Sequence, residues 1–325
     1  MTPRPLIVRL RNWVGDVILG VPALRLLQSQ GHDLRLIGKP WAGSLLAGEG
    51  WTVMPLATGG WRARVSQLRQ LRWQCRQQDP GFDRRVNTLV LPFSMSSALD
   101  ARLAGLRALG YAHEGRSLLL HQALPRQRGL HELDTYWQLA GALMAPTPPP
   151  LPAIIDLQVG VEARRAAAHL LTAAGLAEGA RYAMLCPFSG GTFEGHDKRW
   201  PGFAEMAAEA ARRWRMPLLI CPGPGEEAQA RAEFPDALVL EGVPLGDYSA
   251  LLQRCTLMVS NDTGPGHLAA AVGAPLLSVL GPTDARQWGA WGPSVTIVQQ
   301  GGDWPAVEQV LAAGTRLLRP ALAAG

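Results

Sequence analysis

The chain has 325 residues, of which 47% are hydrophobic and 18% are charged. This length favours two domains of roughly 150 residues, and no apolar run approaches the roughly 20 residues that a membrane-spanning helix needs. The four cysteines are widely spaced and form no C-x-x-C pair, which argues against a zinc site or a disulfide framework and favours reduced thiols in a cytoplasmic protein.

Positive charge is concentrated in the first half of the chain. Residues 1–150 contain 18 Lys and Arg against 9 Asp and Glu, a net of +9, whereas residues 151–325 contain 13 against 17, a net of −4. This asymmetry predicts an anionic partner for the first half alone, and nucleic acid, anionic lipid and an acidic glycan all qualify. The alternative is an arginine-rich surface from a biased genome, because only Lys39 and Lys198 are lysines.

In the first half, short apolar runs predict strands and apolar residues at helical spacing predict helices. The expected strands are 6–10, 34–37, 51–56 and 86–91. The other expected segments are a loop at 11–16 with a helix after it, a basic amphipathic helix within 61–85, a polar loop at 92–97 and a helix at 131–144. Five prolines within 146–152 cannot lie inside a helix or a central strand, so the domains are expected to be 1–150 and 151–325.

The second half continues the alternation of strand and helix. The expected strands are 182–186, 218–221, 237–240, 257–260, 276–280 and 295–298. The expected helices are 162–174, 203–214, 226–233, 248–255 and 267–272. This order is typical of a parallel, doubly wound domain. No G-x-G-x-x-G follows the first strand of either half and no P-loop motif occurs, so the standard nucleotide fingerprints are absent.

The chain is organised around the stretch 260–271, whose polar first part separates an apolar strand from an alanine-rich helix. Such a strand-to-helix loop lies at the carboxyl edge of the sheet, where open α/β folds bind ligands. Asp262 or Thr263 is a candidate cap for the helix, and Gly264 and Gly266 allow backbone amides to approach an anion. A capped turn followed by a surface histidine, His267, is the alternative interpretation.

Three further loops follow predicted strands. In the loop 187–201, Ser189, Gly190 and Thr192 are suited to wrapping a diphosphate, with Lys198 adding positive charge, unless the loop is only an exposed connection. In the turn 221–227, Glu226 or Glu227 either interacts with a helix dipole or accepts hydrogen bonds from a ribose diol. In the loop 11–16, Asp16 is either a helix N-cap or a general base.

Taken together, these motifs resemble family 9 glycosyltransferases, the heptosyltransferases of lipopolysaccharide core assembly. The resemblance is carried, in the family's order, by N-W-V-G-D at 12–16 with P-A-L at 22–24, D-K-R-W-P at 197–201, D-T-G-P-G-H-L-A at 262–269 and G-P-T-D at 281–284. These motifs span nearly the whole chain. The first motif looks more like the enzymes that add the second heptose than those that add the first.

The resemblance implies an α/β fold of GT-B architecture, with two Rossmann-like doubly wound domains that face a central cleft, and no metal or cofactor. The domain 151–325 would bind a nucleotide-sugar donor, typically ADP-heptose. The basic domain 1–150 would bind an anionic, lipid-linked glycan acceptor, with the protein in the cytoplasm or in peripheral contact with the inner membrane surface. The chemistry would be an inverting displacement, which needs one base to deprotonate the acceptor hydroxyl.

Individual roles follow from the motif positions. Asp16 matches the family's base, and Glu226 or Glu227 would hold the ribose, with no choice between the two. The donor-binding set implied is Ser189, Gly190, Thr192, Lys198, Glu226, Glu227, Asp262, Thr263, Gly264 and His267. The acceptor side is expected to include Asn12, Trp13, Arg69 and Arg72.

Two other classes of function remain open at this point. A GT-B sugar-nucleotide epimerase would need further acid and base residues in its cleft, which the sequence does not clearly display. A non-catalytic protein that binds a sugar nucleotide or nucleic acid is the other class. Nucleic acid would favour aromatic residues interleaved with the basic ones, and Trp61 and Trp73 give thin support, so no nucleic-acid partner is expected.

Overall fold

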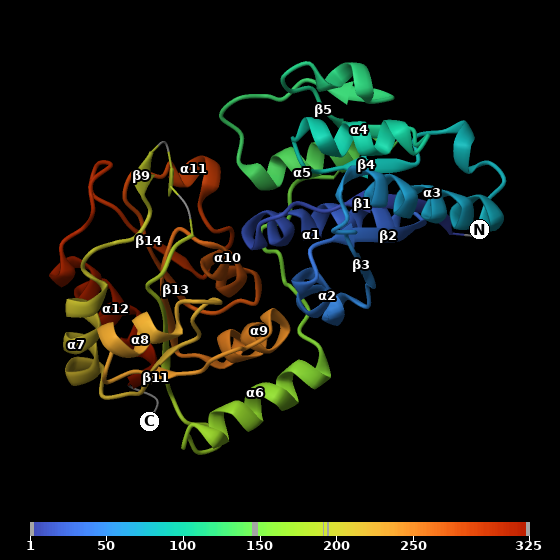
Figure 1. Ribbon diagram of the computed structural model, residues 1–325. Helices are drawn as coiled ribbons and strands as arrows, with labels where there is room; N and C mark the ends of the chain where they lie inside the picture. The colour runs from blue at the N-terminus through green and yellow to red at the C-terminus, as the bar shows by residue number, and fades with distance from the viewer. Residues whose placement is uncertain (1–2, 145–148, 191, 194, 323–325) are drawn as a thin grey trace. The chain divides into compact units, whose positions relative to one another are not determined.

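Two parallel sheets, each within its own compact unit, form the protein in this computed structural model (Figure 1). The first unit is Met1–Pro152 and the second is Ala153–Gly325. The structure describes residues 3–144, 149–190, 192–193 and 195–322, with the backbone alone at 192, 193, 196 and 319–322.

Six parallel strands make up the sheet of the first unit, in the order β3-β2-β1-β4-β5-β6. They are β1 (Arg4–Arg9), β2 (His32–Gly38), β3 (Val53–Pro55), β4 (Thr88–Val90), β5 (Ala108–Tyr111) and β6 (Gln122–Leu124). Strand addition changes direction between β1 and β4, where Ile7 is in register with Thr88. The crevice outside the carboxyl ends at such a switch point is where open α/β sheets bind their ligands.

Helices cover this sheet (Figure 1). The helical segments are α1 (Val14–Ser29), α2 (Trp41–Leu46), η1 (Ala47–Glu49), α3 (Gly60–Gln78), η2 (Phe82–Arg84), α4 (Met95–Leu103), η3 (Arg116–Leu119) and α5 (Glu132–Gly141). Helices α3 and α4 lie on one face, because Leu68 of α3 and Ala98 of α4 join the same buried core as Ile7 of β1. Helix α1 packs against α5.

The second unit repeats the same topology, with the strand order β11-β10-β7-β12-β13-β14. Its strands are β7 (Ala183–Cys186), β10 (Leu218–Ile220), β11 (Leu238–Val239), β12 (Leu257–Asn261), β13 (Leu276–Val279) and β14 (Val295–Val298), with a small antiparallel pair of β8 (Thr192–Phe193) and β9 (His196–Asp197). The switch point here lies between β7 and β12, where Ser260 is in register with Cys186.

The helices of the second unit enclose an aromatic-rich core. They are α6 (Val161–Ala173), α7 (Phe203–Trp214), α8 (Glu227–Glu233), α9 (Leu245–Arg254), α10 (Gly264–Ala271), α11 (Ala285–Trp288) and α12 (Val307–Leu322). Trp200, Phe203 and Trp214 are buried with apolar residues of β7, β12 and α12. Because Trp200 directly follows the loop that contains Lys198, this core anchors one end of that loop.

Some expectations for local structure are wrong. The polar loop expected at 92–97 ends early, because the Ser94 side chain accepts a hydrogen bond from the Ser97 amide and α4 begins at Met95. The basic helix expected within 61–85 is confirmed as α3, although it ends at Gln78 and Arg85 folds back onto Asp79. Asp16 is not an N-cap, because Trp13 occupies that position and Asp16 lies in the first turn of α1.

Among the described residues, no helix is both long enough and apolar enough to cross a membrane.

Candidate functional site

In the first unit, the loops after β1 and β4 meet at the switch point. The Phe93 ring, from the loop after β4, lies under the Arg11 guanidinium at 4.4 Å and the Arg126 guanidinium at 4.5 Å. Arg11 belongs to the loop after β1, and Arg126 follows β6. Cation–π contacts of this kind stabilise both arginines and hold the two loops together.

Asp16 lies at this junction and is held by two hydrogen-bond donors. Arg11 Nε is 3.2 Å from Asp16 Oδ2, and Tyr136 donates its hydroxyl hydrogen to Asp16 Oδ1 across 3.0 Å. Burial, reinforced by the Asp16 carboxylate, keeps the pKa of Tyr136 well above its ordinary value. The phenol therefore remains a donor at neutral pH and fixes the carboxylate in one orientation.

A second carboxylate, that of Glu132, pairs with the arginines around Asp16. Glu132 is fully buried, with Arg126 Nη2 at 2.8 Å from one oxygen and Arg11 Nη2 at 3.9 Å from the other. Burial raises the pKa of Glu132, although Arg126 and Arg11 act in the opposite direction. Asp16 keeps 12% of its side chain exposed and Glu132 keeps none, so Asp16 is the carboxylate of this pair that a ligand can reach. An oriented, reachable carboxylate in the first turn of the helix after β1 is suited to accepting a proton.

In the second unit, the loop after β12 leads directly into α10. The N-cap of α10 is Thr263, whose side chain makes no capping hydrogen bond. Its hydroxyl lies instead 3.2 Å from Ser260 Oγ and 3.6 Å from Cys186 Sγ. A helix N-terminus without a side-chain cap leaves amide hydrogens and the positive end of the helix dipole available to an anion.

Asn261 ties together the segments around this helix terminus. It is fully buried, its Oδ1 accepts a hydrogen bond from the Trp200 amide at 2.9 Å, and its Nδ2 donates to the Pro187 carbonyl at 2.9 Å. One side chain therefore links the end of β12 to both ends of the loop 187–200. This places the expected residues Ser189, Gly190 and Lys198 on a segment fastened at both ends to β12.

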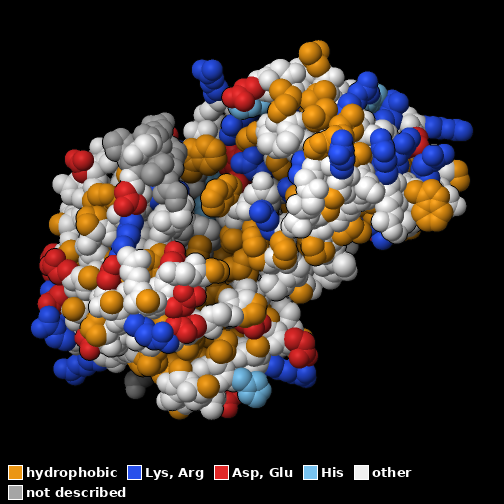
Figure 2. All heavy atoms as spheres, viewed as in Figure 1, with side chains coloured by type: hydrophobic (Ala, Val, Ile, Leu, Met, Phe, Trp, Pro, Cys, Tyr) orange, Lys and Arg blue, Asp and Glu red, His pale blue; other side chains and the backbone are white. Residues whose placement is uncertain are grey.

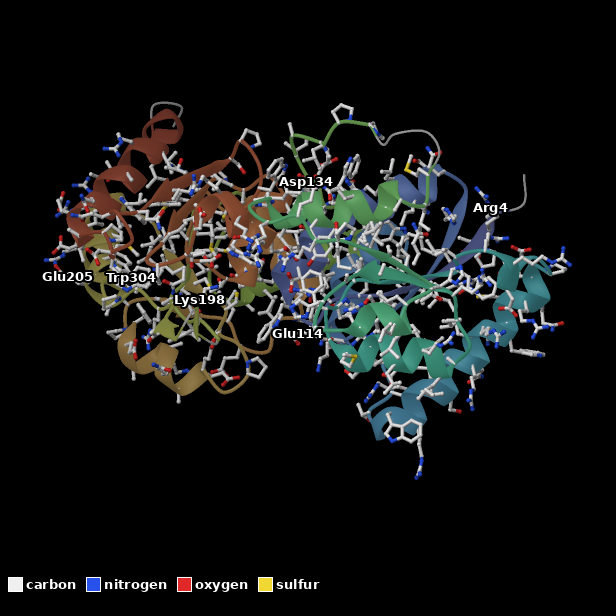
Figure 3. The ribbon with its side chains drawn as sticks, turned by 90° about the horizontal axis from the view of Figure 1, so that it is seen from above. Arg4, Glu114, Asp134, Lys198, Glu205 and Trp304 are labelled. Atoms are coloured by element: carbon white, nitrogen blue, oxygen red, sulfur yellow. The ribbon has the colours of Figure 1, made fainter. Side chains whose placement is uncertain are left out.

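Lys198, labelled in Figure 3, is paired with an acid that directly precedes the N-cap of α10. Its Nζ is 2.7 Å from Asp262 Oδ2, and His267 Nε2 is 3.8 Å from the other oxygen of Asp262. The exposed fractions are 21% for the Lys198 side chain and 9% for Asp262, so the ammonium group is the more accessible partner. The structure thus brings Lys198 next to the stretch that contains Asp262, Thr263, Gly264 and His267. In the sequence, Lys198 precedes this stretch by 64 positions.

The two acids after β10 differ in their surroundings. Glu226 accepts a hydrogen bond from the Gly223 amide and Glu227 accepts one from the Gly225 amide, each at 2.8 Å. Burial raises the pKa of the Cys186 thiol to about 11, and the Glu226 carboxylate contributes to this rise. Both acids therefore accept a hydrogen bond from a glycine amide of the turn, and the charge of Glu226 also acts on the Cys186 thiol.

The other expected residues lie as follows. Ser189 Oγ is buried and has no hydrogen-bond partner among the described residues, and Gly190 is exposed. Asn12 accepts a hydrogen bond from Arg9, and Trp13 is 67% exposed. The side chain of Thr192 lies outside the described residues.

Arg69 and Arg72 lie on α3, away from the strand-end loops in sequence. Arg69 donates to the Leu103 carbonyl at 3.0 Å, and Arg72 is paired with Asp83 at 2.8 Å. The structure therefore gives both guanidinium groups partners within the first unit.

Sequence reasoning missed the residues that orient the site. Tyr136 and Glu132 carry no motif, and only the fold brings them to Asp16. Asn261 stands inside the motif stretch, and an amide at the last position of a buried strand is a signal that could have found it. Arg116 was also missed: it is fully buried, donates to the Pro92 carbonyl, and burial with the nearby Arg11 charge lowers its pKa to about 10.

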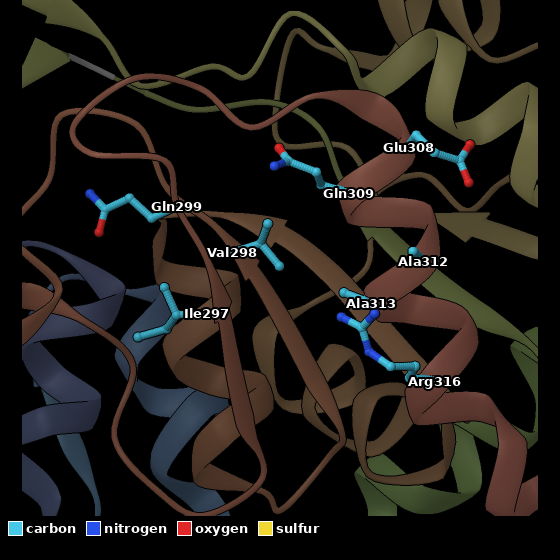
Figure 4. Close-up of a pocket in the computed structure, with 8 residues that line it drawn as sticks. All are labelled: Ile297, Val298, Gln299, Glu308, Gln309, Ala312, Ala313 and Arg316. Carbon is cyan, nitrogen blue, oxygen red and sulfur yellow. The ribbon is translucent and has the colours of Figure 1, made fainter.

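A hollow of about 520 Å³ lies elsewhere in the second unit, between β14 and α12 (Figure 4). It is lined in part by Gln299, Glu308 and Arg316. None of the expected site residues lines it, and β14 is an edge strand of the sheet, away from the switch point between β7 and β12.

Comparisons with known proteins give a family match and several relatives. The model of glycosyltransferase family 9 (heptosyltransferase) matches residues 81–312. Lipopolysaccharide heptosyltransferase 2 of Escherichia coli is 26% identical over 295 residues, 84% of this chain and 81% of that protein. Lipopolysaccharide heptosyltransferase 1 of Pseudomonas aeruginosa is 34% identical over 106 residues, only 33% of this chain and 29% of that protein.

Among solved structures, that of the E. coli ADP-heptose lipopolysaccharide heptosyltransferase II superimposes with a TM-score of 0.77 at 21% identity. The match covers 98% of this chain and 99% of that one. Together with the two parallel sheets, this likeness confirms the expected α/β fold of GT-B type.

Proposed function

Because this chain belongs to glycosyltransferase family 9, the heptosyltransferase family, and is a glycosyltransferase, we propose that it moves a heptose from ADP-heptose to an acceptor of the lipopolysaccharide core. The observation that carries the proposal is the pair of switch points. One presents an oriented carboxylate, Asp16, and the other presents a helix N-terminus with Lys198 beside it. A transferase needs both a base for the acceptor and a positive site for the leaving group.

The second unit binds the donor in this proposal. The diphosphate lies against the start of α10, where Thr263 and Gly264 present backbone amides and Lys198 supplies the charge. Asp262 orients Lys198, and His267 and the loop residues Ser189, Gly190 and Thr192 complete the surroundings of the phosphates. Glu226 or Glu227, the two acids after β10, accepts hydrogen bonds from the ribose hydroxyls.

The reaction is an inverting displacement. Asp16 takes the proton from the acceptor hydroxyl while that oxygen forms a bond to the anomeric carbon of the heptose. The bond from this carbon to the β-phosphate oxygen breaks on the opposite face, and ADP leaves with the electron pair. Arg11 and Tyr136 keep Asp16 oriented, and Lys198 with the α10 dipole stabilises the departing diphosphate without a metal ion.

The first unit binds the acceptor, an anionic, lipid-linked glycan at the cytoplasmic face of the inner membrane. Its net charge of +9 supports this assignment, as does the buried Arg116, whose Nε and Nη2 have no partner among the described residues. Asn12 and the exposed Trp13 stand directly before α1, where an acceptor sugar would approach Asp16. Arg69 and Arg72 are proposed to act at longer range through their charge.

Acceptor-dependent release of ADP tests the proposal. Purified protein with ADP-heptose and a delipidated core oligosaccharide is expected to release ADP and to increase the acceptor mass by one heptose. Isomerisation of the donor without transfer would indicate an epimerase, and donor binding without turnover would indicate a non-catalytic protein. Chelation by EDTA is expected to leave the rate unchanged, and a loss that magnesium restores would contradict the metal-free mechanism.

A further inference from the structure

We propose that the outer face of α3, α4 and η3 docks on an anionic lipid bilayer. The docking face comprises Met95, Leu99, Leu103 and Leu118 with Arg62, Arg69, Trp73 and Arg102. This inference rests on the proposed function only in that a lipid-linked acceptor gives the enzyme a reason to bind a membrane.

The apolar part of the docking face is a stripe on α4. Met95, Leu99 and Leu103 recur every four residues and are 45%, 39% and 40% exposed, whereas Ala98 and Ala101 on the inner side are buried in the core. Leu118, on the neighbouring η3, is 88% exposed. Four large aliphatic side chains on one surface are costly to leave in water, so they indicate a partner that covers them.

The basic part lies on α3, directly beside this stripe. Arg62, Arg69 and Trp73 share the exposed side of the helix, with Trp73 61% exposed. Arg69 donates a hydrogen bond to the carbonyl of Leu103 at 3.0 Å, which joins the two parts. Because α3 and α4 cover the same face of the sheet, their outer sides point the same way. Figure 2 shows hydrophobic and basic side chains gathered side by side over these two helices.

The charge pattern selects an anionic surface. Helix α3 contains no acidic residue, and the single acid of α4, Asp100, is buried and paired with Arg64. Arg62, Arg69 and Arg102 are exposed and form no ion pair with a described residue. Interfacial protein surfaces combine aliphatic side chains that enter the headgroup region, tryptophan at the boundary and arginines that attract anionic lipid. An anionic bilayer satisfies all three features together.

Sedimentation with phosphatidylcholine vesicles, with and without phosphatidylglycerol, tests the proposal on the full chain. The protein is expected to bind only the phosphatidylglycerol vesicles at physiological salt. The triple variant Arg62→Gln/Arg69→Gln/Arg102→Gln should lose about a hundredfold in affinity, since each surface arginine is worth about fivefold. The matched variant Arg165→Gln/Arg212→Gln/Arg213→Gln, on exposed arginines of the second unit, should bind like the parent protein.

The aliphatic stripe is tested separately. Salt screens the arginines, so the binding that persists at high salt comes from insertion of apolar side chains. The variant Leu99→Ser/Leu103→Ser/Leu118→Ser should abolish this remaining binding. The control Ile154→Ser/Val161→Ser/Ile297→Ser removes three other exposed aliphatic side chains and should have no effect.

Three outcomes would overturn the proposal: no binding of the parent protein to anionic vesicles, equal losses in test and control variants, or a dimer in gel filtration that the leucine variant dissociates while vesicles stay unbound. The last would assign the face to a second copy of the chain. The vesicles contain neither donor nor acceptor. Vesicle binding can therefore be absent from a protein that has transferase activity, and it can be present in a protein that lacks this activity.

Discussion

Replacing Asn261 by alanine removes the side chain that fastens the loop 187–200 to the end of β12. The Trp200 amide and the Pro187 carbonyl, both of buried residues, then lose partners that lie at 2.9 Å. An unsatisfied buried polar group costs about 1–3 kcal/mol, so the two together cost at least about 2 kcal/mol. If that loop must be ordered to bind the diphosphate, the dissociation constant for ADP should rise about 30-fold.

A matched variant separates this effect from general destabilisation. Asn87 of the first unit is equally buried, and its side chain accepts from the Arg107 amide at 2.9 Å and donates to the Phe82 carbonyl at 3.2 Å. Asn87→Ala should lower the melting temperature by a similar amount and leave ADP affinity intact. Isothermal titration calorimetry with ADP, alongside thermal melts, makes the comparison. Unchanged ADP affinity in a folded Asn261→Ala protein would refute the reasoning.

Three other predictions address the remaining parts of the account. Lys198→Ala should weaken ADP binding about 10- to 100-fold, as expected for a lost charge-assisted bond, and should barely affect adenosine binding. Lys39→Ala is the control. Equal losses of affinity for ADP and adenosine would mean that Lys198 has a structural role. Tyr136→Phe should lower kcat about tenfold and leave ADP affinity unchanged. The control Tyr182→Phe loses a buried hydrogen bond to the Leu251 carbonyl and should keep its kcat. Equal kcat values for the two variants would exclude a role of Tyr136 in the reaction. Burial and the neighbouring Arg4 lower the pKa of His32 in the folded protein. As the pH falls below about 6.5, the imidazole is protonated in the unfolded chain before it is protonated in the folded one, so the free energy of unfolding should fall. A His32→Gln protein with the same pH dependence in chemical denaturation would exclude His32 as its cause.

The alternation of apolar and helical segments was enough to predict both parallel sheets and the strand ends that carry the candidate residues. Strands β5 and β6 were missed, because Ala108–Tyr111 and Gln122–Leu124 are short and lack a run of β-branched residues. Helix α4 was read in part as a loop, since Met95–Ser97 looks polar until Ser94 is seen to cap it. Local propensity is weak for such short elements, and tertiary packing decides them.

The sequence predicted those candidate site residues that lie in loops directly after strands. Asp16 and the stretch from Asp262 to His267 could be singled out because each follows a strand at the carboxyl edge of its own sheet, where open α/β folds bind ligands. The contact between Tyr136 and Asp16 joins residues 120 positions apart, and the partnership of Arg11, Glu132 and Arg126 depends on how α5 packs against α1. These residues act through tertiary geometry, which no local pattern records.

The central claim is that Asp16 is the base, and the turnover of Asp16→Asn tests it most directly. Asparagine keeps the size of the side chain but cannot accept the acceptor's proton, and general-base catalysis contributes about 10²- to 10⁴-fold. The variant should therefore lose at least about a hundredfold in kcat while ADP-heptose binds as before, because the base acts in the transition state. Asp100→Asn, which alters another buried acid paired with an arginine in the same unit, should retain its kcat. Near-normal turnover of a folded Asp16→Asn protein would contradict the account.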